Sequence, residues 1–147
     1  MKLRYIIVAV MLASGSVAMF TDYGKRLTEK VLRQILLYQV EKTAGNLREA
    51  LPQRLENATL VDVQTVGTVF EQKIVLDVTR QQIDLAHFKA ESKKQLLSIC
   101  RNEQMLPFLK KGISYKYIYL SHDGLGLHTI LIGRKQCRHI WKKLTKQ

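Results

Sequence analysis

The chain has 147 residues, of which 46% are hydrophobic, and a formal net charge of +12. This apolar fraction excludes an intrinsically disordered chain and predicts one packed domain. The excess of Lys and Arg favours acidic partners, namely an anionic membrane surface, an acidic protein face or nucleic acid.

The first 18 residues have the order of a secretory signal peptide. Lys2 and Arg4 precede an apolar run over residues 5–12, and Ser16 and Ala18 occupy the −3 and −1 positions of a cleavage site. We therefore predict export to the periplasm with cleavage after Ala18, which lowers the net charge to +10. An uncleaved inner-membrane anchor is the alternative, but the apolar run extended through Phe20 is about 16 residues, short for a membrane span, which needs roughly 20. Export makes nucleic acid the least expected partner, and we predict none.

Residues 19–50 are predicted to form an N-terminal amphipathic helix. Leu27, Val31, Ile35 and Tyr38 recur at helical spacing, with basic residues between them. Pro52 bounds this helix, because the residue before a proline avoids helical geometry. A second unit, the main domain, is expected over residues 51–137.

The main domain is predicted to begin with a β-hairpin. Residues 59–66 and 69–79 alternate between apolar and polar side chains, and Gly67-Thr68 lies between them as a tight turn. The period then becomes helical over residues 83–100. A short helix over residues 102–111 follows and ends at Gly112.

A second hairpin completes the main domain. Strands are predicted over residues 114–121 and 127–132, around the turn His122-Asp123-Gly124. The order helix, hairpin, helix, hairpin predicts an α+β fold. We expect an antiparallel sheet of about four strands, with the helices packed on one face.

Cys100 and Cys137 are the only cysteines and are predicted to form a disulfide. An exported chain meets an oxidising compartment, where two cysteines usually pair. Two buried free thiols are the alternative. Zinc is not expected, because no Cys or His lies at ligand spacing from either cysteine.

Catalytic and metal-binding motifs are missing from the sequence. The spacing of the four histidines matches no helical metal pair; they are His87, His122, His128 and His139. His122 beside Asp123 has the composition of a proton-transfer pair, but Asp-Gly in a hairpin is usually turn chemistry. No nucleophile elbow, phosphate loop or dinucleotide fingerprint is present. We therefore predict a protein that is not an enzyme and that takes no cofactor, metal or small-molecule substrate.

Tyr115, Tyr117 and Tyr119 lie on one face of a predicted strand and are the candidate partner-binding residues. Two other interpretations stay open. Such a face commonly packs under a helix as part of the core. The strand could also lie at an exposed sheet edge, where a partner segment adds a further strand.

Residues 138–147 are predicted to be a basic C-terminal tail. The basic residues toward this end have no acidic residue among them; they are Lys135, Arg138, Lys142, Lys143 and Lys146, with His139. This charge suits an anionic membrane surface or an acidic protein. A solvated, frayed tail without a partner is the alternative.

The C-terminal half resembles a known group of proteins. The residues that carry the resemblance are Cys100-Arg101-Asn102-Glu103, Pro107, the run Leu109-Lys110-Lys111-Gly112-Ile113-Ser114-Tyr115, Asp123-Gly124 and Cys137. This pattern is similar to that of small exported bacterial two-cysteine α+β proteins, which include the β-type, AspS-like pilotins of type II secretion. The resemblance covers about residues 51–137 and implies an α+β fold with a disulfide.

For pilotins the resemblance implies binding of the C-terminal segment of a secretin subunit and escort of that subunit to the outer membrane. The chain departs from the pilotin pattern, because no lipid-acceptor cysteine follows Leu12-Ala13-Ser14-Gly15. The leading hypothesis is a non-enzymatic periplasmic accessory protein of a secretion or pilus-type machine. It would hold a segment of an envelope protein, such as a secretin or another secretion-machine subunit, on a sheet edge or in a helix–sheet groove.

Two other classes of function remain as alternatives. The first is a periplasmic inhibitor or immunity-type protein that neutralises an acidic partner, which the basic charge favours. The second is a small hydrolase that uses His122 and Asp123.

Overall fold

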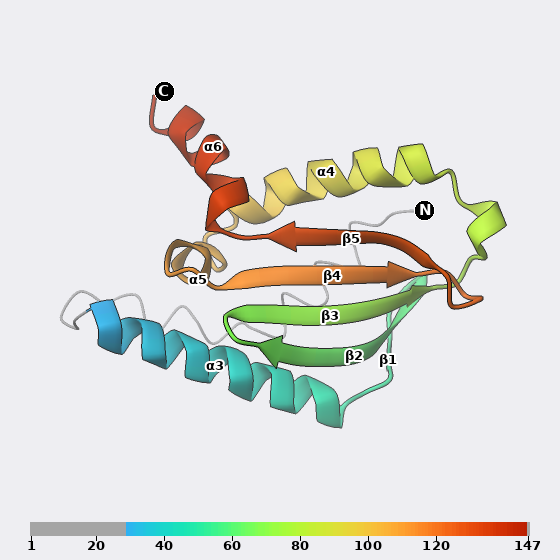
Figure 1. The fold of residues 1–147 in the computed structure, drawn as a ribbon, viewed down its shortest axis with the longest axis horizontal. Coiled ribbons are helices and arrows are strands. Elements are labelled where there is room, and N and C mark those ends of the chain that lie inside the picture. Colours follow the sequence, from blue (N-terminus) through green and yellow to red (C-terminus); the bar gives the residue numbers. More distant parts are fainter. Residues whose placement is uncertain (1–28, 147) are drawn as a thin grey trace.

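The computed structural model describes residues 29–146 and contains a five-stranded sheet with strand order β1-β2-β3-β4-β5. The strands are β1 (Gln53–Arg54), β2 (Ala58–Val66), β3 (Val69–Leu76), β4 (Ser114–Leu120) and β5 (Gly126–Ile132). The helices are α3 (Glu29–Glu49), α4 (Leu85–Arg101), α5 (Leu106–Lys110) and α6 (Arg134–Leu144), with a 3-10 turn over Arg80–Gln82 (Figure 1). The predicted α+β fold is confirmed. The predicted signal peptide and the start of the N-terminal helix lie outside the described residues.

Both predicted hairpins are present. β2 pairs with β3 and β4 pairs with β5 in antiparallel register, and Gly67 supplies the positive φ of 60° at the first turn. The junction between the hairpins is different, because β3 and β4 run parallel from the pair Val69–Ser114 to the pair Val75–Leu120. Helices α4 and α5 form the crossover that a parallel pair requires. The sheet is therefore mostly antiparallel, and the two-residue strand β1 is its fifth member.

The helices cover one face of the sheet. Along β3 and β4 every second side chain is buried, whereas the alternate ones, such as Lys73 and Lys116, are partly exposed. α3 packs against β2 and α4 packs against β5, so the two helices lie toward opposite edges of the sheet (Figure 1). This arrangement agrees with the predicted packing of helices on one face.

Helix α3 buries a different stripe from the one predicted. Val31 is 40% exposed and Tyr38 is 65% exposed, so these two predicted positions face away from the core. The buried residues of α3 are Leu36, Val40, Ala44 and Leu47. Both sets of residues recur at helical spacing. The packing of α3 against β2 decides which set is buried. Leu27 lies outside the described residues.

The C-terminal segment is helical rather than a frayed tail. Helix α6 begins after Gly133 and ends at Leu144, with Cys137 buried on its inner side. Cys137 is bonded to Cys100 at the end of α4, which confirms the predicted disulfide. The side-chain N–H of Trp141 also donates to the carbonyl oxygen of Cys100 over 2.8 Å. Two contacts therefore hold α6 against the end of α4.

Candidate functional site

The structure places the three candidate tyrosines inside the core. Tyr117 and Tyr119 are 1% and 0% exposed, and their strand β4 lies between β3 and β5 rather than at an edge. Burial raises the pKa of Tyr115, Tyr117 and Tyr119 above the ordinary tyrosine value. The ring of Phe88 on α4 meets Tyr119 edge to face at 5.3 Å. These positions correspond to the core interpretation, and their side chains present no surface to a partner.

Several buried polar atoms of the sheet and of α4 have no hydrogen-bond partner among residues 29–146. They are Oε1 of Gln72 on β3, the hydroxyl of Tyr119 on β4, and both amide atoms of Gln95 on α4. An unpaired buried polar group costs about 1–3 kcal/mol, so such groups call for an explanation. Three elements, β3, β4 and α4, therefore carry buried polar side-chain atoms without a partner.

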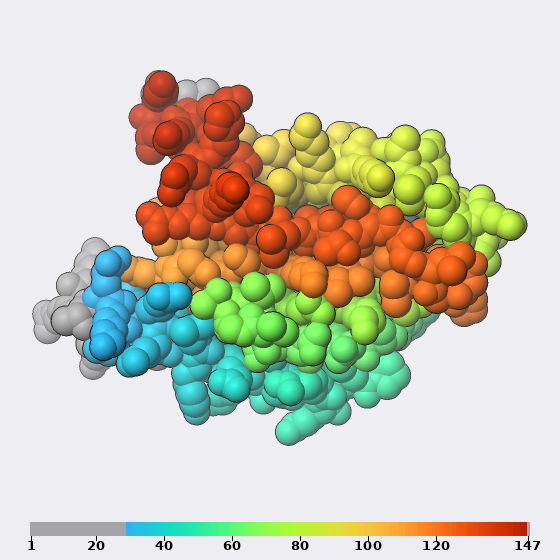
Figure 2. Space-filling model, viewed as in Figure 1, coloured from blue at the N-terminus to red at the C-terminus, as the bar shows by residue number. Residues whose placement is uncertain are grey.

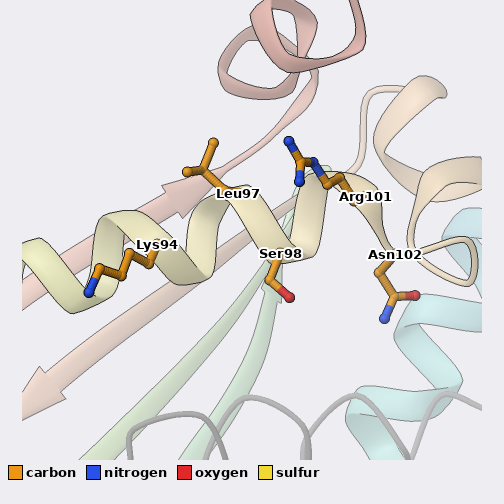
Figure 3. Close-up of a pocket in the computed structure, with 5 residues that line it drawn as sticks. All are labelled: Lys94, Leu97, Ser98, Arg101 and Asn102. Carbon is orange, nitrogen blue, oxygen red and sulfur yellow. The ribbon is translucent and has the colours of Figure 1, made fainter. Parts of the chain in front are cut away.

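An open hollow lies along the solvent side of α4. Its volume is about 510 Å³, and it is lined by Lys94, Leu97, Ser98, Arg101 and Asn102. Figure 3 shows Leu97 and Arg101 pointing away from Ser98 and Asn102 across the helix. The lining supplies two cationic groups, two hydrogen-bonding side chains and one apolar side chain, Leu97, which is 42% exposed. This mixture suits a peptide segment that carries a carboxylate and an apolar residue.

The folding of α4 determines where these side chains lie. Asp84 caps the helix, because its Oδ1 accepts from the backbone N–H groups of Ala86 and His87. Phe88, Ile99 and Cys100 are buried, which leaves the hollow-lining residues on the other sides of the helix. The Nζ of Lys94 donates to Glu91 over 2.6 Å, one helical turn away. The disulfide of Cys100 fixes the C-terminal end of the hollow.

The second face of the sheet carries a polar network centred on Glu71. Its carboxylate accepts from the Nζ of Lys116 and from the side-chain amide of Gln64, each over 2.7 Å. These bonds connect β2, β3 and β4 across the sheet face that the helices leave uncovered. The hydrogen bond from Lys116 is the main reason that the pKa of Glu71 lies below its ordinary value, and the bond from Gln64 adds to this effect.

We expect this network to make stability depend on pH. The lowered pKa of Glu71 means that its contribution is complete above the unfolded value of 4.5 and is lost as pH falls through the folded value. The variant Glu71→Gln should lose about 1 kcal/mol of unfolding free energy at neutral pH and much less in acid. Urea unfolding of both proteins across the acid range measures this difference. A constant difference at every pH would contradict the prediction.

Basic residues gather on α6 and around its base. The outward side of the helix carries exposed Arg134, Lys135, Arg138, His139, Lys142 and Lys143, and Lys146 follows the helix. The Nζ of Lys110 on α5 lies 6.0 Å from the centre of the Trp141 ring. Figure 2 shows the C-terminal residues standing out from the body at the upper left. The predicted basic residues are thus displayed by a helix.

His122, Asp123 and His128 make contacts that belong to the fold. His122 and Asp123 lie in the β4–β5 turn, where Oδ1 of Asp123 accepts from the backbone N–H of Arg80 over 3.3 Å. The pKa of Asp123 is lowered mainly by a hydrogen bond with the Ser121 side chain. The ring of His128 packs against Phe88. Burial is the main cause that lowers the pKa of His128, and the positive charge of Lys89 adds to this effect.

Residues 29–146 contain no group of three His, Cys, Asp or Glu side chains that could hold a metal ion. None of the helices in this range is long and apolar enough to cross a membrane.

Sequence comparison finds neither a matching family model nor a matching curated protein. Comparison of structures does find similar folds. The pilotin EpsS of the Vibrio vulnificus type 2 secretion system matches with a TM-score of 0.57 and 12% identity over 74% of this chain and 96% of that chain. The type II secretion pilotin AspS from Vibrio cholerae matches with a TM-score of 0.52 and 18% identity over 74% and 97% of the two chains.

A third similar structure is a protein from Pseudomonas aeruginosa, with a TM-score of 0.58 and 14% identity over 72% of this chain and 96% of that chain. Each match spans nearly the whole of the known structure, so the entire pilotin fold has a counterpart here. At these identities the likeness is one of fold. The chain thus has the α+β fold that is seen in type II secretion pilotins.

Proposed function

We propose that this protein is a non-enzymatic, pilotin-like accessory protein of an envelope secretion machine. It would act in the periplasm and bind a segment of an envelope protein, with a secretin subunit as the expected partner. The fold shared with two type II secretion pilotins supports the class of function. The signal-peptide pattern of residues 1–18 supports the compartment.

The observation that carries the proposal is the hollow along α4. Arg101 at its margin attracts a carboxylate, whereas Lys94 already donates to Glu91, and Leu97 offers an apolar contact between the two basic residues. The side-chain amide of Gln95, on the buried side of the same helix, has no hydrogen-bond partner among the described residues.

A photo-crosslinking experiment in the native host tests the proposal. A photoreactive residue at Leu97, in the hollow, is expected to capture a secretin or another secretion-machine subunit. Val66 provides the matched control, because it is an apolar residue that is 57% exposed at the β2–β3 turn. We expect no capture from that position. Equal capture from both positions, or none from either, would contradict the proposed site.

A companion substitution measures the contribution of the hollow. Leu97→Glu places a negative charge where an acidic segment is expected and should weaken partner capture about tenfold or more. The same change at Val66 should leave capture unchanged, and thermal unfolding should show both variants folded. If Leu97→Glu binds the partner as well as the parent does, the hollow is not the binding site.

An inhibitor of an acidic protein is the second candidate, because the exposed side of α6 is basic and free of acidic residues. Such a complex would be soluble and would weaken steeply with salt. Recovery of one soluble acidic protein from the crosslinking experiment, with no secretion-machine subunit, would replace the proposed function by this candidate.

A further inference from the structure

Helix α6 separates its apolar and basic side chains onto opposite sides. Cys137 is buried, and Ile140 and Trp141 are partly buried against the core. The opposite side carries the basic face of α6, which we define as Arg134, Lys135, Arg138, His139, Lys142 and Lys143. Every member of this face is exposed, and the helix contains no acidic residue. The charges are therefore available to one external surface at the same time.

The shape around this face favours a flat partner. The C-terminal end of α6 extends beyond the sheet and beyond α4 (Figure 1), so the basic face projects rather than lining a depression. Leu144 is the one large apolar residue of α6 that is strongly exposed, at 44%. Tight protein partners usually need a central apolar or aromatic anchor in a pocket, and this face provides none. A lipid surface needs only many charges in one plane.

We propose that the basic face of α6 docks the protein onto an anionic phospholipid surface. Two contacts at Cys100 hold α6 in a fixed direction on the folded domain. Cys100 forms the disulfide with Cys137, and its carbonyl oxygen accepts the hydrogen bond from Trp141. The attraction is electrostatic. This inference does not depend on the proposed secretin partner.

Vesicle sedimentation with the full chain tests this proposal. The vesicles contain phosphatidylglycerol mixed with phosphatidylcholine, and vesicles of phosphatidylcholine alone are the lipid control. The test variant combines Arg138→Gln, Lys142→Gln and Lys143→Gln. Each basic residue near an anionic surface changes partitioning about fivefold, so the triple variant should bind roughly a hundredfold more weakly. Binding of the parent should also fall steeply as salt is added.

A second triple variant is the matched control for net charge. Lys30→Gln, Arg33→Gln and Lys42→Gln remove the same charge from exposed positions of α3. This control should keep most of the binding, because its changes lie outside the basic face of α6. Equal losses in the two variants would mean that net charge alone matters and would overturn the proposal. The proposal would also be overturned if the parent bound polyglutamate, used as an acidic protein mimic, but not anionic vesicles.

Discussion

Removal of the disulfide, by Cys100→Ser with Cys137→Ser, is expected to lower the free energy of unfolding by about 3–4 kcal/mol. The bond closes a loop with a sequence separation of 37 residues, and its loss gives the unfolded chain more conformations. For a domain of this size the change is a large share of the total stability. Denaturant unfolding of the oxidised parent and the double variant measures the difference.

The reduced parent is the control for this prediction. Its stability should match that of the double variant, because both lack the same covalent link. Amide exchange should show that α6 loses protection before the sheet does, since Cys137 is the one fully buried residue of that helix. If the oxidised and reduced proteins unfold at the same denaturant concentration, the disulfide contributes nothing to stability, contrary to this expectation.

Replacement of Tyr119 by Ala is expected to destabilise the protein by about 3–5 kcal/mol. Tyr119 is 0% exposed on β4, between β3 and β5, and its ring contacts Phe88 on α4 edge to face. Loss of the ring leaves a cavity between the sheet and the helix that borders the hollow. Chemical unfolding monitored by the fluorescence of Trp141 measures this loss.

Tyr119→Phe is the matched control, because it keeps the ring and removes only the hydroxyl. That hydroxyl has no hydrogen-bond partner among the described residues, so its removal should change stability by less than about 1 kcal/mol. Partner capture from Leu97 should also be unchanged if Tyr119 acts only in the core. A large loss of stability in Tyr119→Phe would show that the hydroxyl is hydrogen-bonded in solution. A selective loss of capture would restore Tyr119 as a partner-binding residue.

The candidate site was only partly predictable from the sequence. The helix that carries it was expected over residues 83–100, and α4 spans Leu85–Arg101. The hollow itself was missed, because Lys94, Ser98 and Arg101 have the composition of any solvated helix face. The three tyrosines drew attention because they stand out in the sequence, although the open interpretations included the core. Their burial follows from the position of β4 between β3 and β5, which no local pattern contains.

Helix α6 shows how a strong charge signal can hide a structural one. Cys137, Ile140, Trp141 and Leu144 recur at helical spacing, which is a signal that could have predicted this helix. The basic residues between them favoured the interpretation as a tail. The apolar side is only partly covered, because α6 extends past the end of α4. Helix α6 thus buries few side chains and displays a large positive charge.

The sequence by itself determined the local elements other than β1 and α6, and it determined the identity of the disulfide partners. Alternation defined both hairpins, Gly67 marked the first turn, and Gly112, with a φ of 88°, ends α5 as expected. The tertiary structure alone decided which stripe of α3 is buried, that β3 and β4 run parallel, and where the hollow lies. Local periodicity depends on neighbours along the chain, whereas burial and strand order depend on contacts between segments that are far apart in it.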